Sequence, residues 1–270
     1  MVEPGTRIAD HPTVRFGEGN HPLVIVPGLS DALQGDETPR FVQLLLERYY
    51  MRALADDFDV YIVSRPRELA DGVTTRELAA GYASVLSEIG PADVLGMSMG
   101  GLIAQYLAID HPENVQNLVI ALAGPHLSAS GREAVTEWRD AARDGRWGEV
   151  HLSTVDATYS SAGKRAAYGV LLKLPGVIKE PPYPDDFINS AQACLDHDSG
   201  DELADIDSQT LTLGGEQDVL FDASDLRWMA ETIPNAETHI LKDTGHGAFE
   251  EQRRAFSGAI TSFLLASDSE

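Results

Sequence analysis

Six short apolar runs alternate with helical patterns along most of the chain, and this alternation limits the fold more than any other feature of the sequence. The runs occupy residues 22–28, 58–66, 92–98, 115–124, 209–215 and 237–243. Nearly continuous apolar character is typical of strands in a parallel sheet that is covered on both faces. Strands that alternate with helices build α/β folds with right-handed crossovers. We therefore predict an α/β fold with a mostly parallel central sheet and helices on both faces.

Two of the segments between these runs carry clear helical signals. Residues 41–57 space their apolar side chains near the 3.6-residue period of a helix. Residues 74–90 add signals for both ends, because Thr74 and Glu77 fit a capping box and Gly90 follows the last turn. We expect a helix in each segment.

The alternation stops between Gly124 and Ser208, where helical patterns are separated by Gly, Ser and Pro residues. This stretch is too long for an ordinary connection. We therefore predict a core domain of residues 1–123 and 208–270 and a helical cap insertion of residues 124–207. Its large apolar side chains either line a pocket facing the sheet or pack inside the insertion; they are Trp138, Trp147, Tyr159, Tyr168, Leu171, Leu172, Phe187 and Ile188.

Acidic residues dominate the charge of the chain, with 43 Asp and Glu against 20 Lys and Arg and a formal net charge of −23. A nucleic-acid partner is not expected, because phosphate binding needs a basic face. Only four of the basic residues are lysines. Such an excess of carboxylates suits molar salt, where repulsion is screened, so salt adaptation and unusual acidity in a mesophile are the two interpretations. Residues 196–207 carry six acids and no base, and we interpret them as a solvated exit from the insertion.

Several classes of protein are not expected from the sequence. No run approaches the roughly 18 to 20 apolar residues that cross a bilayer, and the first residues resemble no secretory signal, so we expect no membrane span and a cytoplasmic location. Cys194 is the single cysteine, which excludes an intrachain disulfide, and we expect it to be a small buried residue. The chain has no His-Glu-x-x-His motif and no Cys/His cluster, so no metal is expected.

One serine stands among glycines between a predicted strand and a predicted helix. Gly96, Ser98 and Gly100 match the pattern Gly-x-Ser-x-Gly, after the strand at 92–95 and before the helical segment that ends at Pro112. A serine on so tight a turn is strained, and glycines two residues before and after it give the strand and the helix room to approach. Its hydroxyl is thereby exposed, and the helix N-terminus favours a developing negative charge.

The same glycines do not fit a phosphate-binding loop. The pattern Gly-x-Gly-x-x-Gly needs glycine where Ser98 stands, and a P-loop needs Lys and Ser or Thr where Leu102 and Ile103 stand. We therefore interpret Ser98 as a candidate nucleophile.

A serine hydroxyl becomes a nucleophile only when a base accepts its proton and an acid orients that base. Among the eight histidines we select His246, because it follows the last predicted strand in a loop flanked by glycines. Asp218 is the candidate acid, since it lies in a short Gly-rich loop after the strand at 209–215. Asp222 and Asp243 compete with it, although we expect Asp243 to lie on its strand, only three residues from His246.

The other histidines are assigned less specific places. We expect His111 at a helix end and His239 within a strand to be structural. His126, His151 and His197 lie in or beside the insertion, where surface positions are expected and substrate contact is the alternative. His11 and His21 are expected to precede the sheet.

At these residues the chain resembles the α/β-hydrolase fold family. The resemblance covers residues 22–265 and rests on Gly-x-Ser-x-Gly-Gly at 96–101, on the strand-Gly-x-x-Asp element that ends at Asp218 and on the loop of His246. The order Ser, Asp, His agrees with that family, and the insertion stands where the family has its cap. One departure is the strand that ends at Val26, which leads into Pro27-Gly28 where the family usually has His-Gly.

The resemblance implies acyl transfer without a metal or organic cofactor. Ser98, activated by His246 and Asp218, would attack a carbonyl, and the backbone N–H groups of Leu29 and Met99 would hold the oxyanion. Serine at this position argues against the epoxide hydrolases and haloalkane dehalogenases of the fold, which use aspartate. We predict a carboxylesterase for small to medium esters, with a small-molecule ester as its partner. The alternatives are a C–C bond hydrolase, an amidase or a cofactor-free perhydrolase of the same fold, or a silent ligand-binding module.

Overall fold

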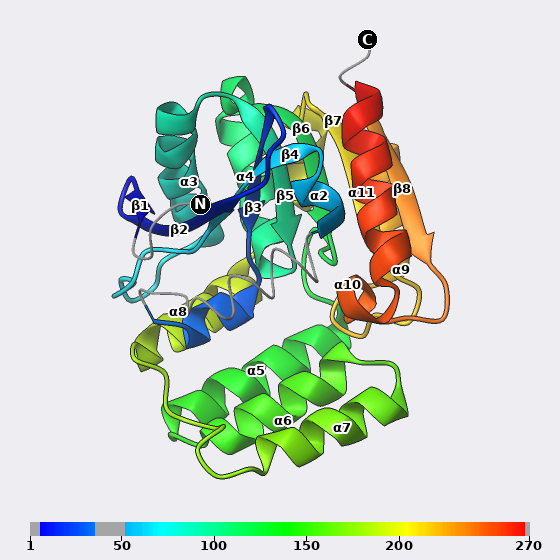
Figure 1. Ribbon diagram of the computed structural model, residues 1–270. Coiled ribbons are helices and arrows are strands. Elements are labelled where there is room, and N and C mark those ends of the chain that lie inside the picture. Colours follow the sequence, from blue (N-terminus) through cyan, green and yellow to red (C-terminus); the bar gives the residue numbers. More distant parts are fainter. Residues whose placement is uncertain (1–5, 36–51, 268–270) are drawn as a thin grey trace.

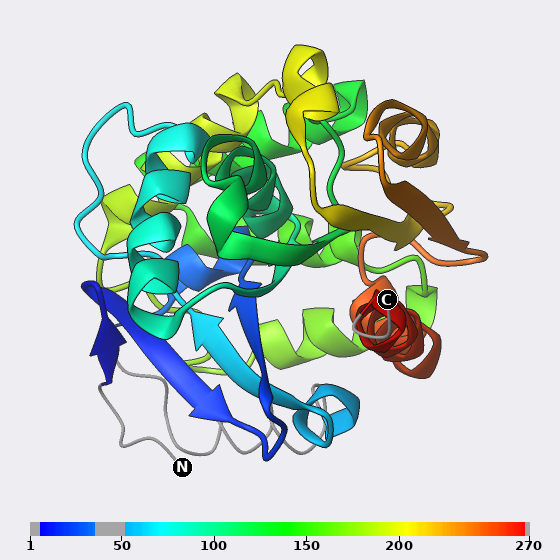
Figure 2. The ribbon, with the colours of Figure 1, turned by 90° about the horizontal axis from the view of Figure 1, so that it is seen from above.

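An eight-stranded sheet runs through the middle of the molecule, with helices on both of its faces (Figures 1 and 2). The structure is a computed structural model that describes residues 6–35 and 52–267. The strand order is β1-β2-β4-β3-β5-β6-β7-β8. Its strands are β1 (Arg7–Ile8), β2 (His11–Phe16), β3 (His21–Val26), β4 (Phe58–Val63), β5 (Ala92–Met97), β6 (Val115–Ala121), β7 (Gln209–Gly215) and β8 (Ala236–Leu241).

The six predicted runs form the six strands β3 to β8, and neighbours among them pair in parallel. The predicted fold class is therefore confirmed. β1 and β2 were not predicted, because residues 7–16 lack a continuous apolar run; β2 joins the edge of β4 in antiparallel pairing. The expectation that His11 and His21 precede the sheet is wrong, since His11 lies in β2 and His21 begins β3.

Alternating side chains of the strands supply two separate cores. Val24 of β3 joins the core under α3 (Thr75–Ile89), α4 (Met99–Asp110) and α9 (Ala223–Thr232). Its neighbours Leu23 and Ile25 join the core under α2 (Arg52–Ala55) and α11 (Arg253–Ser267) on the opposite face. This alternation follows from the two-residue period of a strand.

The two predicted helices have different outcomes. Residues 74–90 form α3, and its capping box is present: the Thr74 side chain accepts from the Glu77 N–H, and the Glu77 carboxylate accepts from the Thr74 N–H at 2.8 Å. Of the helix predicted at 41–57, α2 is described, and residues 41–51 lie outside the described residues.

A layer of helices connects β6 to β7 and lies across the carboxyl ends of the strands (Figure 1). It contains α5 (Ala129–Arg143), α6 (Trp147–Thr158), α7 (Ala162–Leu172), α8 (Pro184–Asp196) and the 3-10 helix η4 (Gly200–Asp205). No strand occurs between residues 124 and 208, all of which are described, as the sequence predicts.

Cys194 on α8 is buried, as expected, and burial raises the pKa of its thiol to about 12. The division into two domains stays a prediction.

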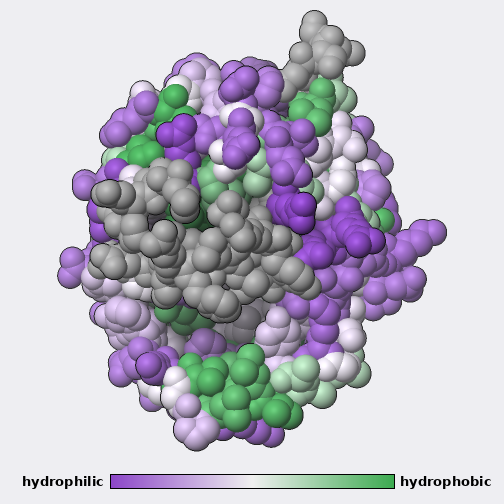
Figure 3. All heavy atoms as spheres, in the orientation of Figure 1, coloured by the Kyte–Doolittle hydropathy of each residue, from purple (hydrophilic) through white to green (hydrophobic). Residues whose placement is uncertain are grey.

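The surface of this helical layer is partly apolar. Figure 3 shows an apolar patch at the lower end of the molecule, where the layer lies. The exposed large apolar side chains of the helices and loops between β6 and β7 are Leu152, Val170, Leu171, Leu174 and Val177. Among the described residues, no helix combines the length and the apolar character that crossing a bilayer would require.

Candidate active site

Ser98 lies on the sharp turn between β5 and α4, with a φ of 54° and a ψ of −122°. A positive φ is uncommon for a residue with a side chain and marks local strain. The turn is closed by hydrogen bonds from the Ser98 N–H to the Ala121 carbonyl at 2.8 Å and from the Gly101 N–H to the Ser98 carbonyl at 2.7 Å. The side chain of Ser98 is only half-buried, so the turn presents its hydroxyl.

The glycines on either side of Ser98 are required by close packing. A Cβ atom on Gly96 would lie 2.5 Å from the Gly100 carbonyl oxygen, and one on Gly100 would lie 1.9 Å from the carbonyl oxygen of Val26. Both distances are shorter than any real contact of a Cβ atom. The glycines therefore allow the strand, the turn and the end of β3 to meet.

Three loops bring Ser98, His246 and Asp218 into one hydrogen-bonded chain. The Ser98 hydroxyl lies 2.9 Å from Nε2 of His246, and Nδ1 of His246 lies 2.8 Å from Oδ2 of Asp218. The other oxygen of Asp218 accepts the N–H groups of Leu220 at 2.8 Å and Phe221 at 3.3 Å, which fixes the carboxylate. His246 and Asp218 are both buried, so the hydrogen bond between them is shielded from water.

The competing acids lie elsewhere. Asp222 precedes α9 and is exposed, and Asp243 is exposed in the turn after β8. The expectation that Asp243 lies on its strand is wrong, because β8 ends at Leu241 and the chain then turns toward the loop of His246. Both ring nitrogens of His246 already have partners in Ser98 and Asp218.

Leu29 and Met99 both lie close to Ser98 in the fold, Met99 as its chain neighbour and Leu29 as the neighbour of Gly28. Met99 is the first residue of α4, where N–H groups have no partner inside the helix. Leu29 begins the 3-10 helix η1 (Leu29–Leu33) directly after Gly28. A Cβ atom on Gly28 would lie 3.2 Å from the Cβ of Ser98. The structure therefore brings all five predicted site residues into one region.

The sequence of residues 23–259 matches the model of the alpha/beta hydrolase family. This chain belongs to the alpha/beta hydrolase family. It is 26% identical over 227 residues to the pimeloyl-[acyl-carrier protein] methyl ester esterase of Vibrio cholerae, which covers 78% of this chain and 86% of the relative. The enol-lactonase from Burkholderia xenovorans LB400 has a similar fold, with a TM-score of 0.76, 20% identity and coverage of 94% of this chain and 95% of the other. The esterase from Exiguobacterium antarcticum gives a TM-score of 0.74, 20% identity and coverage of 93% and 94%.

The hydrolase has a second cluster of polar contacts, which joins the histidine loop, residues 242–247 around His246, to the helical layer. The N–H of Gly247 donates to the carbonyl of Thr158 at 2.6 Å. Glu250, on α10 (Ala248–Glu251), accepts hydrogen bonds from Tyr159 at 2.6 Å and from Tyr168 at 3.0 Å. Burial raises the pKa of Glu250, but bonds from Lys164 and the two tyrosines hold that pKa below its usual range.

Glu251 makes a similar connection beside Glu250. Its carboxylate accepts the hydroxyl of Ser160 at 2.7 Å, the N–H of Ser161 at 2.8 Å and the hydroxyl of Thr244 at 2.9 Å. Glu250 and Glu251 carry no distinctive signal in the sequence, since two acids after the histidine loop equally suit a solvated helix start.

The large apolar residues of the helical layer of the hydrolase have different surroundings. Trp138, Trp147 and Phe187 are 5% exposed or less, and the rings of Trp147 and Phe187 lie 5.8 Å apart, edge to face. Tyr159 and Tyr168 stack at 4.9 Å. Leu171 is 47% exposed on the outside of the molecule. A pocket-lining role for these side chains stays a prediction.

The predictions for the other histidines of the hydrolase have different outcomes. His111 ends α4 and His239 lies in β8, as predicted. The expectation of a surface position is wrong for His197, which is buried beside the hydroxyl of Thr75 at 2.8 Å. Burial lowers the pKa of His197 to about 3 and keeps the ring neutral. His126 is exposed, as expected.

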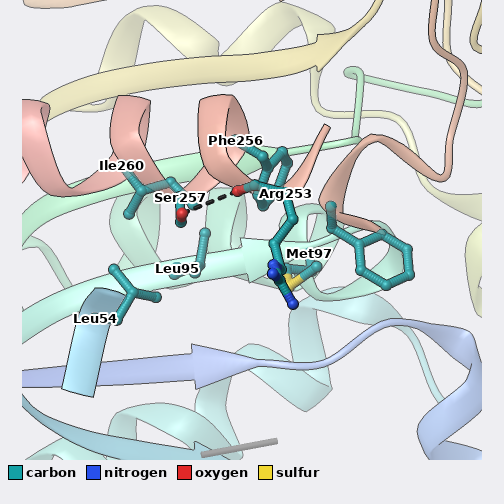
Figure 4. A pocket seen from close by; sticks show the side chains of 8 residues that line it. Leu54, Leu95, Met97, Arg253, Phe256, Ser257 and Ile260 are labelled. Atoms are coloured by element: carbon teal, nitrogen blue, oxygen red, sulfur yellow. Dashed lines mark hydrogen bonds between the residues drawn. The ribbon is translucent and has the colours of Figure 1, made fainter. Parts of the chain in front are cut away.

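A small apolar cavity lies behind the turn of Ser98, between β5 and α11 (Figure 4). Met97 and Leu95 approach it from the strand and Phe256 and Ile260 from the helix. Its volume of about 10 Å³ is at the lower limit for one water molecule, and none of the side chains of Ser98, Asp218 and His246 lines it. It is too small for a substrate.

The described part of the hydrolase has no group of three or more His, Cys, Asp or Glu side chains that could hold a metal ion.

Proposed function

We propose that this hydrolase is a carboxylesterase that cleaves small to medium esters through an acyl-enzyme intermediate on Ser98. The observation that carries the proposal is the hydrogen-bonded chain from Asp218 through His246 to Ser98, with 2.8 and 2.9 Å between the bonded atoms. The names of the relatives add support, since the Vibrio cholerae protein and the Exiguobacterium antarcticum protein are both called esterases.

The reaction begins when Nε2 of His246 takes the hydroxyl proton of Ser98 while its oxygen bonds to the ester carbonyl carbon. Asp218 stabilises the imidazolium that forms. The N–H groups of Leu29 and Met99 donate to the oxyanion of the tetrahedral intermediate. The C–O bond to the alcohol then breaks, and His246 returns the proton to the departing oxygen.

Deacylation repeats these roles with water in place of the serine. His246 accepts a proton from the water as its oxygen attacks the acyl carbon, and the second tetrahedral intermediate is held by the same two N–H groups. Its collapse releases the carboxylic acid and returns the proton to Ser98. Residues 124–207 act as the cap in this proposal, because they lie across the carboxyl ends of the strands, where substrates of open α/β sheets bind.

A fluorophosphonate probe combined with an ester assay tests the proposal. The probe labels only an activated serine, so it can be used before the substrate is known. We expect the wild-type chain to label and to hydrolyse an activated ester, and Ser98→Ala to abolish labelling and to lower kcat by at least about 10⁴-fold at an unchanged unfolding temperature. Turnover that survives in Ser98→Ala, or a wild-type chain that neither labels nor hydrolyses esters, would refute the assignment. A parallel screen of amides and β-diketones separates the amidase and C–C hydrolase alternatives.

A further inference from the structure

Arg65, two residues after the end of β4, is fully buried beside the loop that carries Leu29. Its guanidinium donates to three successive carbonyl groups of that loop: Pro27 at 2.9 Å, Gly28 at 3.0 Å and Leu29 at 3.5 Å. A planar guanidinium suits this task, because it presents a fixed fork of donors and stays charged. Arg65 takes no part in the proposed reaction steps.

The direction of these carbonyls also determines the direction of the N–H groups. In a trans peptide the C=O of one residue and the N–H of the next lie in the same plane and point in opposite directions. The carbonyl of Gly28 points at Arg65, so the N–H of Leu29 points away from it. β3 lies between β4, which precedes Arg65, and β5, which precedes Ser98. The side away from Arg65 is therefore the side of Ser98, against which Gly28 packs.

The positive charge of Arg65 should also strengthen the Leu29 N–H as a hydrogen-bond donor. A cation at the carbonyl end of a peptide polarises the group and makes its N–H a stronger donor in a buried setting. Asp31 helps to fix the position of Arg65. Its carboxylate accepts hydrogen bonds from the backbone N–H of Arg65 and from the guanidinium of Arg67, both at 3.1 Å. Burial raises the pKa of Asp31, but Arg65 and Arg67 hold that pKa below its usual range, so the carboxylate stays ionised.

We propose that Arg65 is a positioning residue of the oxyanion hole, which turns the peptide between Gly28 and Leu29 so that the Leu29 N–H faces the oxyanion and donates strongly to it. The proposal rests on the ester hydrolysis proposed above. It also accounts for the Pro27-Gly28 departure, because the loop is aimed through its backbone carbonyls and requires no histidine side chain.

Arg65→Lys tests the proposal, with Arg67→Lys as the matched control. The Arg67 side chain is 5% exposed, and it binds Asp31 and the Gly35 carbonyl rather than the carbonyls of residues 27–29. We expect Arg65→Lys to lower kcat by about 10- to 100-fold, a part of the loss that follows removal of an oxyanion-hole donor. KM should change less than about 3-fold, and a trifluoromethyl ketone, whose bound form carries the oxyanion, should bind more weakly by the same factor as kcat. Arg67→Lys should leave kcat within about 3-fold of wild type.

A second variant removes the N–H itself. Leu29→Pro places proline at the first position of η1 after an extended Gly28 (φ −71°, ψ −172°), where proline fits the backbone. We expect it to lose kcat by about 100-fold and Arg65→Lys to cause no further loss in that background. If Arg65→Lys alone reduces stability, comparing its effect in the wild-type and Leu29→Pro backgrounds still shows whether the loss of kcat acts through the Leu29 N–H.

Two results would overturn the proposal: an unchanged kcat and ketone affinity in Arg65→Lys, or equal losses from Arg65→Lys with and without Leu29→Pro. Failure of the proposed function is a different result, since the wild-type chain would then neither label with the fluorophosphonate nor hydrolyse esters.

Discussion

At the scale of single residues, Ser98 is exposed by a backbone that few residues tolerate. Its φ of 54° is held by hydrogen bonds on both sides of the turn and by the close approach of the Gly100 region to Val26. Strain of this kind persists only where the surroundings fix it. The hydroxyl is therefore presented to His246 before any substrate arrives, which reduces the reorganisation needed during the reaction.

The choice of acid is the first prediction at this scale. Asp218→Asn keeps the oxygen that accepts from Leu220 and Phe221 but no longer selects the right tautomer of His246, so kcat should fall by about 10²- to 10⁴-fold. Asp222→Asn and Asp243→Asn change exposed residues and should stay within about 3-fold of wild type. Steady-state kinetics on one activated ester decide the matter, and a larger loss in either control would mean that the acid is misassigned.

At the scale of elements, the histidine loop depends on the turn between α6 and α7. Glu250 and Glu251 follow His246 on α10 and accept hydrogen bonds from Tyr159 and Ser160, across 91 positions of sequence. The loop therefore has its base in the sheet and one side fixed to the helical layer. A displacement of this turn would be transmitted to the histidine through a few short contacts.

The stability of this connection should depend on pH. Burial raises the pKa of Glu251, but hydrogen bonds from Ser160, Ser161 and Thr244 outweigh burial and hold that pKa below its ordinary value of 4.5. A lowered pKa in the folded state stabilises the fold above the unfolded pKa, and the contribution is lost as the pH falls through the folded pKa. Glu251→Gln should therefore lower the free energy of unfolding by about 1 kcal/mol near pH 7, and its difference from wild type should narrow below pH 4.5.

Urea unfolding at several pH values measures this difference. Glu133→Gln on α5 is the control for the loss of one negative charge, since Glu133 is exposed; its effect should be small at every pH. A Glu251→Gln deficit that stays constant from pH 7 to pH 3, or widens on acidification, would contradict the account.

At the scale of the whole molecule, charge is the dominant property. A formal net charge of −23 places like charges close together over much of the surface. In dilute buffer each carboxylate is repelled by neighbours within a Debye length of about 10 Å or more, which destabilises the compact state. Salt also weakens exposed ion pairs such as Arg76–Glu202, but each contributes only about 0–1 kcal/mol.

We therefore predict that the unfolding midpoint and the esterase activity rise together between roughly 0.1 and 2 M KCl. Residues 196–207 should loosen early at low salt, although the structure ties them down more than expected: Leu203 and Ile206 are buried, and Glu202 pairs with Arg76. Thermal melts and hydrogen exchange follow the two effects.

Neutralising part of this segment provides the matched control. Combined Asp→Asn changes at the exposed positions 201, 205 and 207 should raise the midpoint at 0.1 M KCl and reduce the gain at 2 M, because they remove part of the repulsion. A wild-type midpoint that is flat or falling with KCl would reject salt adaptation.

Patterns within the amino-acid sequence predict which segments become the parallel strands and the long helices, and they point to Ser98, Asp218 and His246. These properties are local, because apolar period, capping residues and glycines around a turn act within a few positions of each other. The catalytic roles of the three residues remain predictions, although the structure brings them together.

The places of β2, Arg65 and Glu251 depend on contacts that exist only in the folded chain. β2 is a strand because β4 offers it an edge, and Arg65 acquires partners because a loop 36 to 38 positions away turns its carbonyls inward. Glu251 meets Ser160 across 91 positions. Backbone carbonyls and sheet edges have no sequence signature of their own, since every residue supplies the same groups and only the folded chain decides which of them converge.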